Sequence, residues 1–373
     1  MPETLSLAQM LTGWFPRQPP PQRKLPIPPP PCYHSPVPPR LAFQEYELHL
    51  RDPWKISRGA ATSKRNAFLQ IAQDGLIGEG EAAFHGHFGE SPATVHADLT
   101  RATAGLTSIE LNQLDALPFT GASRTALEMA LLDWQAKRAN LPLHRFLGLP
   151  ASLHPILTSF SIGIDTPERM HEKALAAADF HSVKIKLGTP ADRERFEAVR
   201  SATTAPIRID ANGGWETREQ ALEMIEWLAD NRGVELIEQP LPAGRLNDTA
   251  WLTARSPLPI ILDEDARTTA DIPALAGKCH GINIKLMKTG GLLEAVAMAN
   301  VARHHDLKIM LGCMIESSLA IGAALHLAPL ADWIDLDGHL LIANDPYQGI
   351  TLHHGHLLPP AGPGIGVHRH LPS

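Results

Sequence analysis

Short apolar runs follow one another along the chain after residue 150, and longer amphipathic stretches separate them. Such runs are typical of buried parallel strands, whereas apolar residues at helical spacing mark the stretches between them. The predicted strands are Ile156–Ile164, Ser182–Leu187, Ile207–Asp210, Val234–Glu238, Ile260–Asp263, Gly281–Leu286, Lys308–Cys313 and Trp333–Asp337. The predicted helices include Arg169–Phe180, Arg193–Ala202, Arg218–Ala229 and Leu292–His304. This alternation predicts an α/β fold with a closed parallel barrel. A doubly wound open sheet is the alternative, but no glycine-rich dinucleotide fingerprint follows the first strand.

Residues 41–150 show a different pattern, which predicts a small α+β unit. Polar and apolar residues alternate in Leu41–Leu50 and Ala67–Ile71, as in antiparallel strands with one solvated face. Gly78-Glu79-Gly80 indicates a turn, and helical spacing marks Ser123–Asn140. The polar segment Trp54–Lys64 fits neither pattern, so we expect a loop there that closes over a site.

Composition narrows the class of protein. The first 40 residues contain 13 prolines, so we expect residues 1–40 to form a disordered extension. The 373-residue chain has a net charge of −7 and no basic stripe, which argues against nucleic acid as a partner. No run approaches the roughly 20 apolar residues that cross a bilayer, and three scattered cysteines make neither a disulfide framework nor a zinc site. We expect a soluble, cytoplasmic protein that forms a homo-oligomer.

Charged side chains near the ends of the predicted strands are the candidate chemistry. Lys184 and Lys186 lie two apart, so they share one face of a strand, either inside the barrel or on a solvated edge. Asp210, Glu238 and Asp263 each close a strand, and the carboxyl ends of parallel strands meet at one mouth. A lone acid there often caps a helix, but three acids together would repel one another unless a cation lay among them. Oxygen ligands alone favour Mg²⁺.

These residues carry a family resemblance. From about residue 41 to 355 the chain resembles the enolase superfamily, in the branch related to muconate-lactonizing enzymes, and within it the dipeptide epimerases. The matching motifs are Lys184-Ile-Lys186, the ordered acids Asp210, Glu238 and Asp263, the segment Ile282–Gly291, the segment Gly312–Ser318, and Asp335-Leu-Asp337. For the epimerases the specific part is Asp-x-Asp.

The resemblance implies a modified TIM (β/α)7β barrel over residues 151–339. It also implies an α+β capping domain over 41–150, to which the C-terminal residues 340–373 return. Mg²⁺ would bind Asp210, Glu238 and Asp263. Lys186 and Lys285 would be the two bases, and Lys184 would steer the first base and the metal-bound carboxylate. Lys288 is expected to begin a loop and to have no role in the chemistry.

Asp335 and Asp337 select among the reactions of this family. Lying two apart on the last strand, they would both aim into the pocket and bind the ammonium group of a dipeptide. The alternative is that one or both cap a turn at Gly338. Ser161 matches a position that lines the pocket. Arg58 either meets an acidic substrate side chain or is an exposed loop residue without a partner.

The expected activity is Mg²⁺-dependent epimerisation of a dipeptide such as L-Ala-L-Glu, by 1,1-proton transfer through an enolate. Fixed positive charge from Mg²⁺ and Lys184 would stabilise the enolate as it forms. The same charge should lower the pKa of Lys186 and Lys285, so that a neutral amine can accept a proton. The alternatives are o-succinylbenzoate synthase, muconate cycloisomerase or N-acylamino acid racemase on the same scaffold. A non-catalytic binding or scaffold role is the alternative from another class.

Overall fold

The computed structural model describes residues 38–57, 59–114, 119, 121–152, 156–230 and 233–370. The predicted proline-rich extension, residues 1–40, therefore lies almost entirely outside the described residues, and Arg58 lies outside them as well. Within the described part of the chain, no helix combines the length and the apolar composition that crossing a membrane requires.

The N-terminal part contains an antiparallel sheet whose strand order is β1-β2-β3. Its strands are β1 (Arg40–Ile56), β2 (Gly59–Gln73) and β3 (Leu76–Ala82). The expectation of a loop over Trp54–Lys64 is wrong, because pairs such as Trp54 with Ala61 continue the β1–β2 hairpin to its tip. The segment Trp54–Lys64 is polar and lacks the alternation of polar and apolar residues by which strands were predicted.

Helix α3 (Gly121–Arg138) packs closely against β3, and two glycines make this possible. Gly78 and Gly80 lie within β3, so the predicted turn at these residues is wrong. A Cβ atom on Gly78 would lie 2.0 Å from the carbonyl oxygen of Ala130, and one on Gly80 would lie 2.0 Å from that of Ala126. These glycines therefore let the helix backbone approach the strand. The other helices of this region are η1 (Gly86–Phe88), α2 (Pro92–Gly105), η2 (Leu111–Leu114) and α4 (Leu143–Phe146).

Eight parallel strands form the barrel, as predicted, and they are joined in chain order. They are β5 (Ser159–Ile162), β6 (Ser182–Lys186), β7 (Ile207–Asp210), β8 (Val234–Glu238), β9 (Ile260–Leu262), β10 (Gly281–Ile284), β11 (Lys308–Gly312) and β12 (Trp333–Asp335). A parallel bridge between Thr158 and Ile334 joins the last strand to the first, so the sheet closes. The closed barrel is confirmed and the open sheet is excluded.

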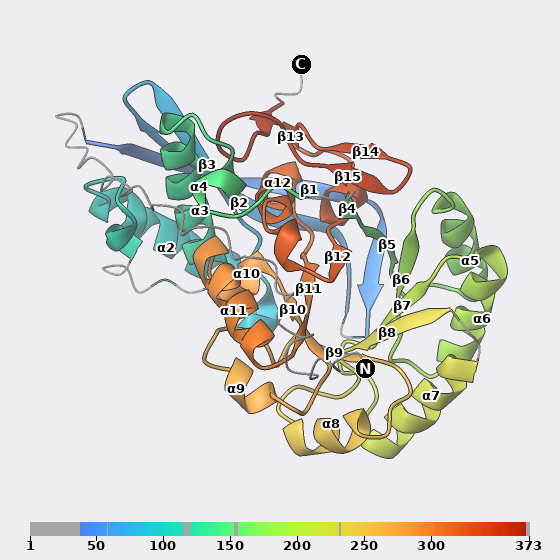
Figure 1. Cartoon of the computed structure of the whole chain (residues 1–373). Helices are drawn as coiled ribbons and strands as arrows, with labels where there is room; N and C mark the ends of the chain where they lie inside the picture. The colour runs from blue at the N-terminus through green and yellow to red at the C-terminus, as the bar shows by residue number, and fades with distance from the viewer. Residues whose placement is uncertain are drawn as a thin grey trace, which may run out of the picture. The chain divides into compact units, whose positions relative to one another are not determined.

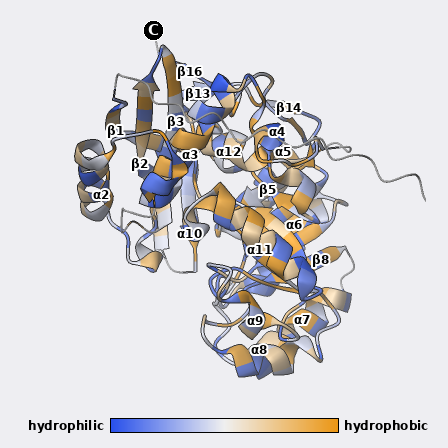
Figure 2. Ribbon diagram, turned by 60° about the vertical axis from the view of Figure 1, so that its left-hand side comes forward, coloured by the Kyte–Doolittle hydropathy of each residue, from blue (hydrophilic) through white to orange (hydrophobic). Residues whose placement is uncertain are grey.

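Helices lie outside this barrel between successive strands (Figure 1). They are α5 (Pro167–Ala176), α6 (Asp192–Ala202), α7 (Arg218–Asp230), α8 (Leu246–Thr253), α9 (Ile272–Leu275), α10 (Leu286–Thr289), α11 (Leu292–His304), α12 (Ser318–Leu325) and η3 (Ala328–Leu330). Figure 2 shows that several of these helices carry both hydrophobic and hydrophilic residues. The helices were predicted from this mixture, because a helix that covers a barrel has an apolar side against the strands and a polar side toward solvent.

The two faces of the barrel strands have opposite character, because side chains alternate along a strand. Val183 and Ile185 of β6 point outward into the large core shared with the helices. Lys184 and Lys186, between and beyond them, point inward and are buried, so the solvated-edge interpretation is wrong. A separate apolar cluster, Leu236, Ile261 and Met310, comes from β8, β9 and β11. Leu236 and Ile261 lie two residues before Glu238 and Asp263, so they share the inward face with these acids. The charged residues thus lie on the inward face, closer than this cluster to the carboxyl ends of the strands.

The C-terminal segment forms two small sheets. The first pairs β13 (Tyr347–Gln348) with β16 (His368–Arg369), and the second joins β14 (Thr351–His353), β15 (His356–Leu358) and β4 (Ile156–Leu157). The predicted first strand is thus divided, with Ile156–Leu157 in the second small sheet. Tyr347 Oη donates to Glu79 of β3 at 3.0 Å, and Ile365 N donates to Asp133 of α3 at 2.8 Å. These contacts agree with a return of this segment to the N-terminal unit, although the exact domain boundaries stay a prediction.

Candidate active site

A cavity of about 290 Å³ lies at the mouth of the barrel, at the carboxyl ends of its strands. The barrel lines it with the charged residues Lys184, Lys186, Asp263, Glu264, Lys285, Asp335 and Asp337. The N-terminal unit lines it with a mixed set that includes Trp54, Ile56, Ala60, Ala61, Lys64 and Phe88. The cavity therefore has a charged side from the barrel and a largely apolar side from the unit that covers it.

The order of the strands fixes how the charged residues face one another. Lys186 ends β6, and Lys285 follows β10, which lies four strands along in a closed ring of eight. The two lysines therefore stand on opposite sides of the mouth. Glu238 on β8 and Asp335 on β12 are likewise four strands apart, and they define a second axis across the first. The acids of β7 and β9 flank Glu238.

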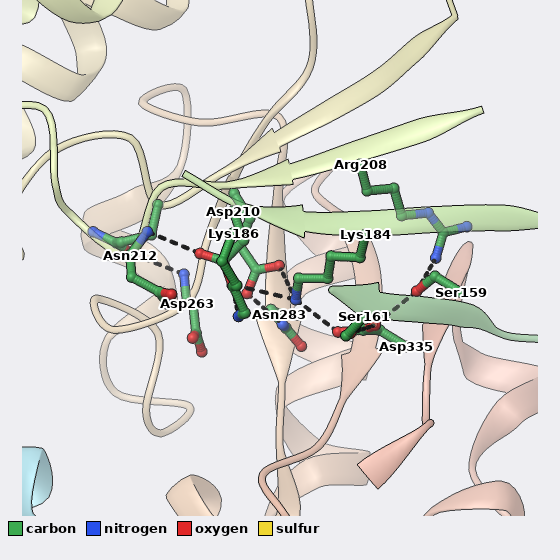
Figure 3. Close-up of polar contacts among 12 residues, drawn as sticks. Ser159, Ser161, Lys184, Lys186, Arg208, Asp210, Asn212, Asp263, Asn283 and Asp335 are labelled. Atoms are coloured by element: carbon green, nitrogen blue, oxygen red, sulfur yellow. Dashed lines mark hydrogen bonds and ion pairs between the residues drawn. The ribbon is translucent and has the colours of Figure 1, made fainter. Parts of the chain in front are cut away.

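Lys184 binds three acids from three strands inside the barrel. Figure 3 shows its side chain between Asp210 and Asp335. Its Nζ lies 2.6 Å from Glu238 Oε2, 2.6 Å from Asp335 Oδ2 and 3.3 Å from Asp210 Oδ2. Burial alone would lower the pKa of Lys184, but the charges of Asp335, Glu238 and Asp210 raise it well above its usual value. Lys184 is therefore a permanent cation and not a base.

Lys186 binds Asp210, the acid at the end of the neighbouring strand. Asp210 also accepts the peptide N–H of Asn212 at 2.9 Å through Oδ1. Burial would raise the pKa of Asp210, but Lys186 and Lys184 outweigh it and hold that pKa well below its usual value. The sequence-based placement of Lys186 at this mouth beside Asp210 is thus reproduced by the fold.

Lys285 binds Asp263 on the other side of the mouth, with 2.8 Å between Nζ and Oδ2. Its Nζ also lies 4.0 Å from Glu238 Oε1. Burial opposes the charged amine, but Asp263 and Glu238 raise the pKa of Lys285 above its usual value. The lowered pKa expected for Lys285 depends on bound Mg²⁺ and stays a prediction.

Lys288 does not begin a loop as predicted. It lies in the short helix α10, its side chain is fully buried, and its Nζ contacts Asp263 Oδ1 at 2.5 Å. The spacing of three residues beyond Lys285 gave no sign of this contact, because one helical turn directly after the strand brings the side chain back beneath it.

Asp210, Glu238 and Asp263 end adjacent strands and supply only oxygen atoms, which suits Mg²⁺. Burial and the charge of Asp210 raise the pKa of Glu238 to about 7, so this group of acids is short of positive charge even beside its lysines. Over the described residues, no three acidic, histidine or cysteine side chains already stand as a metal-holding group. Lys184 Nζ lies between two of the three acids instead. The donor set and its charge fit a divalent cation, and the metal site stays a prediction.

Asp335 and Asp337 differ in what surrounds them. Asp335 Oδ1 accepts the hydroxyl of Ser159 at 2.6 Å, and its Oδ2 faces Lys184. Asp337 Oδ2 accepts the peptide N–H of Ser161 at 2.6 Å, and burial and the charge of Asp335 raise the pKa of Asp337 to about 7. The side chain of Asp337 makes no cap to the helix η4 (Gly338–Leu341) that follows it, so the turn-capping interpretation is wrong.

Ser161 lines the cavity as expected, since it lies on β5 next to both acids. The tip of the β1–β2 hairpin is fixed over the same strand, because Ile164 N donates to Lys55 O at 2.7 Å. A Cβ atom on Gly163 would lie 3.0 Å from that carbonyl oxygen, so the glycine permits this close contact. Arg58 lies outside the described residues, and its role stays a prediction.

Three polar residues that support the site were missed by the sequence analysis. Ser159 binds Asp335 from below, and Asn283 Nδ2 donates to Glu238 Oε1 at 2.8 Å. Gln239 Oε1 accepts the peptide N–H groups of Asp263 and Glu264, at 2.9 and 3.0 Å. Inward-facing polar positions on a barrel strand are the one available signal, and Asn283 carries it, since it lies two residues before Lys285.

Comparison with known proteins identifies the family. Residues 41–148 match the N-terminal domain of mandelate racemase and muconate lactonizing enzyme, and residues 168–370 match the enolase C-terminal domain-like family. These matches cover most of the chain. The protein therefore belongs to the enolase superfamily, in its mandelate racemase and muconate-lactonizing branch.

Individual relatives are similar along nearly their whole length. An L-Ala-D/L-amino acid epimerase from Pedosphaera parvula is 40% identical over 328 residues, which cover 85% of this chain and 94% of the relative. An enolase family member from Agrobacterium tumefaciens, solved with sodium and L-Ala-L-Glu, is 33% identical with a TM-score of 0.79, covering 87% and 98% of the two chains. A dipeptide epimerase from Cytophaga hutchinsonii, solved with Mg and D-Ala-L-Val, is 27% identical with a TM-score of 0.84, covering 90% and 96%.

Proposed function

We propose that this protein is a Mg²⁺-dependent dipeptide epimerase. The observation that carries the proposal is the crossing of two axes at the barrel mouth. Lys186 and Lys285 stand on opposite sides along one axis, and Glu238 and Asp335, which Lys184 bridges, stand on opposite sides along the other. A substrate lying along the second axis would present its α-carbon to one amine on each side. Removal of a proton by one lysine and return by the other inverts that carbon.

The acids at one end of the substrate axis favour a bound cation. Lys285 can act as a base only if the negative charge of Asp263 and Glu238 is offset, because these acids raise its pKa. Asp210, Glu238 and Asp263 would hold Mg²⁺, which would supply that charge and polarise the substrate carboxylate. Lys184 remains protonated beside the same acids, and its fixed charge favours the enolate dianion over the carboxylate from which it forms. The Cytophaga hutchinsonii relative binds Mg, which supports the same ion here.

The acids at the other end favour a substrate with a free ammonium group. Asp337 is buried, has a raised pKa and lines the cavity, so a cation beside it would restore its charge. A dipeptide carries an ammonium group one residue away from the carboxylate that the metal would hold. N-acylamino acids and succinylbenzoate precursors lack this ammonium, which favours the epimerase over the other reactions of the branch.

The relatives give evidence on the identity of the second residue of the dipeptide. Relatives act on L-Ala-D/L-amino acids, and one binds L-Ala-L-Glu. We propose L-Ala-L-Glu or a similar dipeptide as the substrate, with Arg58 meeting an acidic side chain. Arg58→Ala should then raise KM for L-Ala-L-Glu much more than for an apolar dipeptide, and equal effects on both would remove Arg58 from the pocket. A cytoplasmic location and a homo-oligomer stay predictions.

A dipeptide library incubated in D₂O with Mg²⁺ tests the function directly. Mass spectrometry should find one deuterium at the α-carbon of the second residue, together with both epimers, for a subset of dipeptides. Asp335→Asn combined with Asp337→Asn should abolish this exchange while the protein still binds Mg²⁺. Full activity of that double variant, or exchange with acyl amino acids in place of dipeptides, would favour the other reactions of the branch. No exchange with any candidate would favour a non-catalytic role.

A further inference from the structure

The Nζ atom of Lys288 makes three contacts beneath the active-site cavity. It donates to Asp263 Oδ1 at 2.5 Å, to the carbonyl oxygen of Asp263 at 2.5 Å, and to that of Asn283 at 2.9 Å. An ammonium group has three protons and therefore three hydrogen bonds to give. All three are used inside the protein, so Lys288 has no proton left for a substrate, and it does not line the cavity.

Asp263 is held from two sides by two lysines of different kinds. Lys285 binds its Oδ2 at 2.8 Å and lines the cavity, whereas Lys288 binds its Oδ1 from below. A carboxylate fixed through one oxygen still rotates about χ2, whose energy well is broad. When both oxygens are bound, the carboxylate of Asp263 keeps one orientation. The Nζ atom of Lys285, which binds that carboxylate, is then held in one position.

The helix that carries Lys288 is itself fixed by the N-terminal unit. Thr125 Oγ1 of α3 donates to the carbonyl oxygen of Leu286, the first residue of α10, at 2.8 Å. Gly290 ends α10 with φ +83°, a conformation that suits glycine. Helix α3 also accepts the peptide N–H of Leu293 on Glu128 at 2.9 Å. The direction of the Lys288 side chain is thus set by packing outside the cavity.

On the opposite side of the mouth the second lysine, Lys184, contacts Asp210 at Oδ2, the same oxygen that Lys186 binds. Asp210, the partner of Lys186, is held at Oδ1 by the peptide N–H of Asn212 instead. Loss of the Lys288 amine should therefore disturb the side of Lys285 and leave the side of Lys186 in place.

We propose that Lys288 is a positioning residue, which holds Asp263 so that Lys285 meets the substrate α-carbon from its own side. The inference rests on the proposed epimerase function. It assigns Lys288 no contact with the substrate, and it predicts an effect on one of the two proton transfers only.

Exchange of the α-proton in D₂O measures each side separately. Lys285→Met identifies the epimer that loses its proton to Lys285, because that epimer stops exchanging. Lys288→Met should slow exchange of the same epimer by about 100-fold, as expected for a reacting group displaced by about 1 Å. Exchange of the other epimer should stay within a few-fold of the unaltered protein. Equal slowing of both epimers, or of neither, would overturn the proposal.

Two further variants keep the test decisive. Lys288→Gln, whose amide still donates a hydrogen bond, replaces the methionine variant if the latter does not fold, and the same one-sided slowing is expected. Lys137→Met removes an amine that binds a buried aspartate, Asp133, at 2.7 Å, and neither residue lines the cavity. This control should leave both exchange rates unchanged, and one-sided slowing in it would overturn the interpretation.

Calorimetric titration with Mg²⁺ alone provides a measurement that needs no substrate. If Lys288 orients Asp263, its loss should raise the Kd for Mg²⁺ by about 10-fold, as for other residues that orient a metal ligand. Tighter binding in Lys288→Met would mean that Lys288 acts only as a repelling charge, and would overturn the proposal. Absence of exchange in the unaltered protein would instead refute the epimerase function, and with it the proton-transfer part of the inference.

Discussion

Lys184 Nζ lies 2.6 Å from Asp335 Oδ2, so a lysine of β6 and an aspartate of β12 share a buried ion pair inside the barrel. The other oxygen of Asp335 accepts the hydroxyl of Ser159. Asp335 is therefore neutralised inside the barrel by Lys184. Asp337 has a raised pKa, so a cation bound beside it would favour its charged form. Two acids of the same motif thus have different surroundings, and their substitutions should have different effects.

Asp337→Asn should weaken substrate binding without destabilising the protein. Loss of a charged contact to the substrate ammonium should raise KM by about 10- to 100-fold. Because burial raises the pKa of Asp337 to about 7, a neutral amide at this position should leave the melting temperature unchanged or higher. Asp335→Asn should instead lower the free energy of unfolding by roughly 3 kcal/mol, since it removes one partner of a buried ion pair. KM measurements and thermal unfolding of both variants check this, and equal stability losses would contradict it.

Glu316 should make stability fall as the pH rises. Burial raises its pKa to about 8 from a usual value of 4.5, so the folded protein binds the proton more tightly than the unfolded chain. Its contribution is fully present below pH 4.5 and is lost as the pH rises through about 8. Glu316→Gln should therefore match the unaltered protein at pH 4.5 and exceed its free energy of unfolding by on the order of 3 kcal/mol at pH 9. Urea unfolding at both values measures this. Glu223→Gln, at an exposed position, is the control and should show no such difference.

Mg²⁺ should stabilise the folded protein as well as activate it. At a concentration 100 times its Kd, a ligand that binds only the folded state adds about 2.7 kcal/mol. The melting temperature should rise with Mg²⁺ and fall back when a chelator is added. Glu238→Gln should abolish this rise, because the residue lies between the other two acids in the strand order. A rise of the same size in Glu238→Gln would place the ion elsewhere.

Much of the fold and of the site could be predicted from the sequence, because both depend on strand periodicity. Runs that end in Lys184-Ile-Lys186 or in Asp210 predict inward side chains at one mouth once the strands are parallel. The structure confirms the closed parallel barrel and the meeting of these residues at one mouth. The alternation of side chains along a strand and the residue at which a strand ends are local properties, and both can be predicted from the sequence.

Features that depend on contacts between distant segments could not be predicted. Lys288 reaches Asp263 only because α10 begins directly after β10. The hairpin tip near Trp54 stays in strand pairing only because β2 extends far enough to pair with it. Gly78 and Gly80 resemble a turn in the sequence, and their need for glycine comes from α3, about 50 residues later. Such relationships require the packed structure.

Gly78→Ala should destabilise the protein strongly. The added Cβ atom would lie 2.0 Å from the carbonyl oxygen of Ala130, and neither backbone can yield without separating α3 from β3. A cost of at least about 3 kcal/mol in the free energy of unfolding is expected for overpacking of this severity. Gly86→Ala is the matched control, because a Cβ atom there meets nothing within 4 Å. Denaturant titration of both variants should show a large loss for the first and almost none for the second.

Opposed lysines are the central element of the account, and α-proton exchange in Lys186→Met and Lys285→Met tests them most directly. Each variant is incubated with Mg²⁺ in D₂O, once with each epimer of a dipeptide that the unaltered protein converts. Neither variant should interconvert the epimers, and each should still exchange the proton of one epimer, a different one in each variant. If both variants exchange the same epimer, or if either still interconverts the two, the lysines do not act from opposite sides.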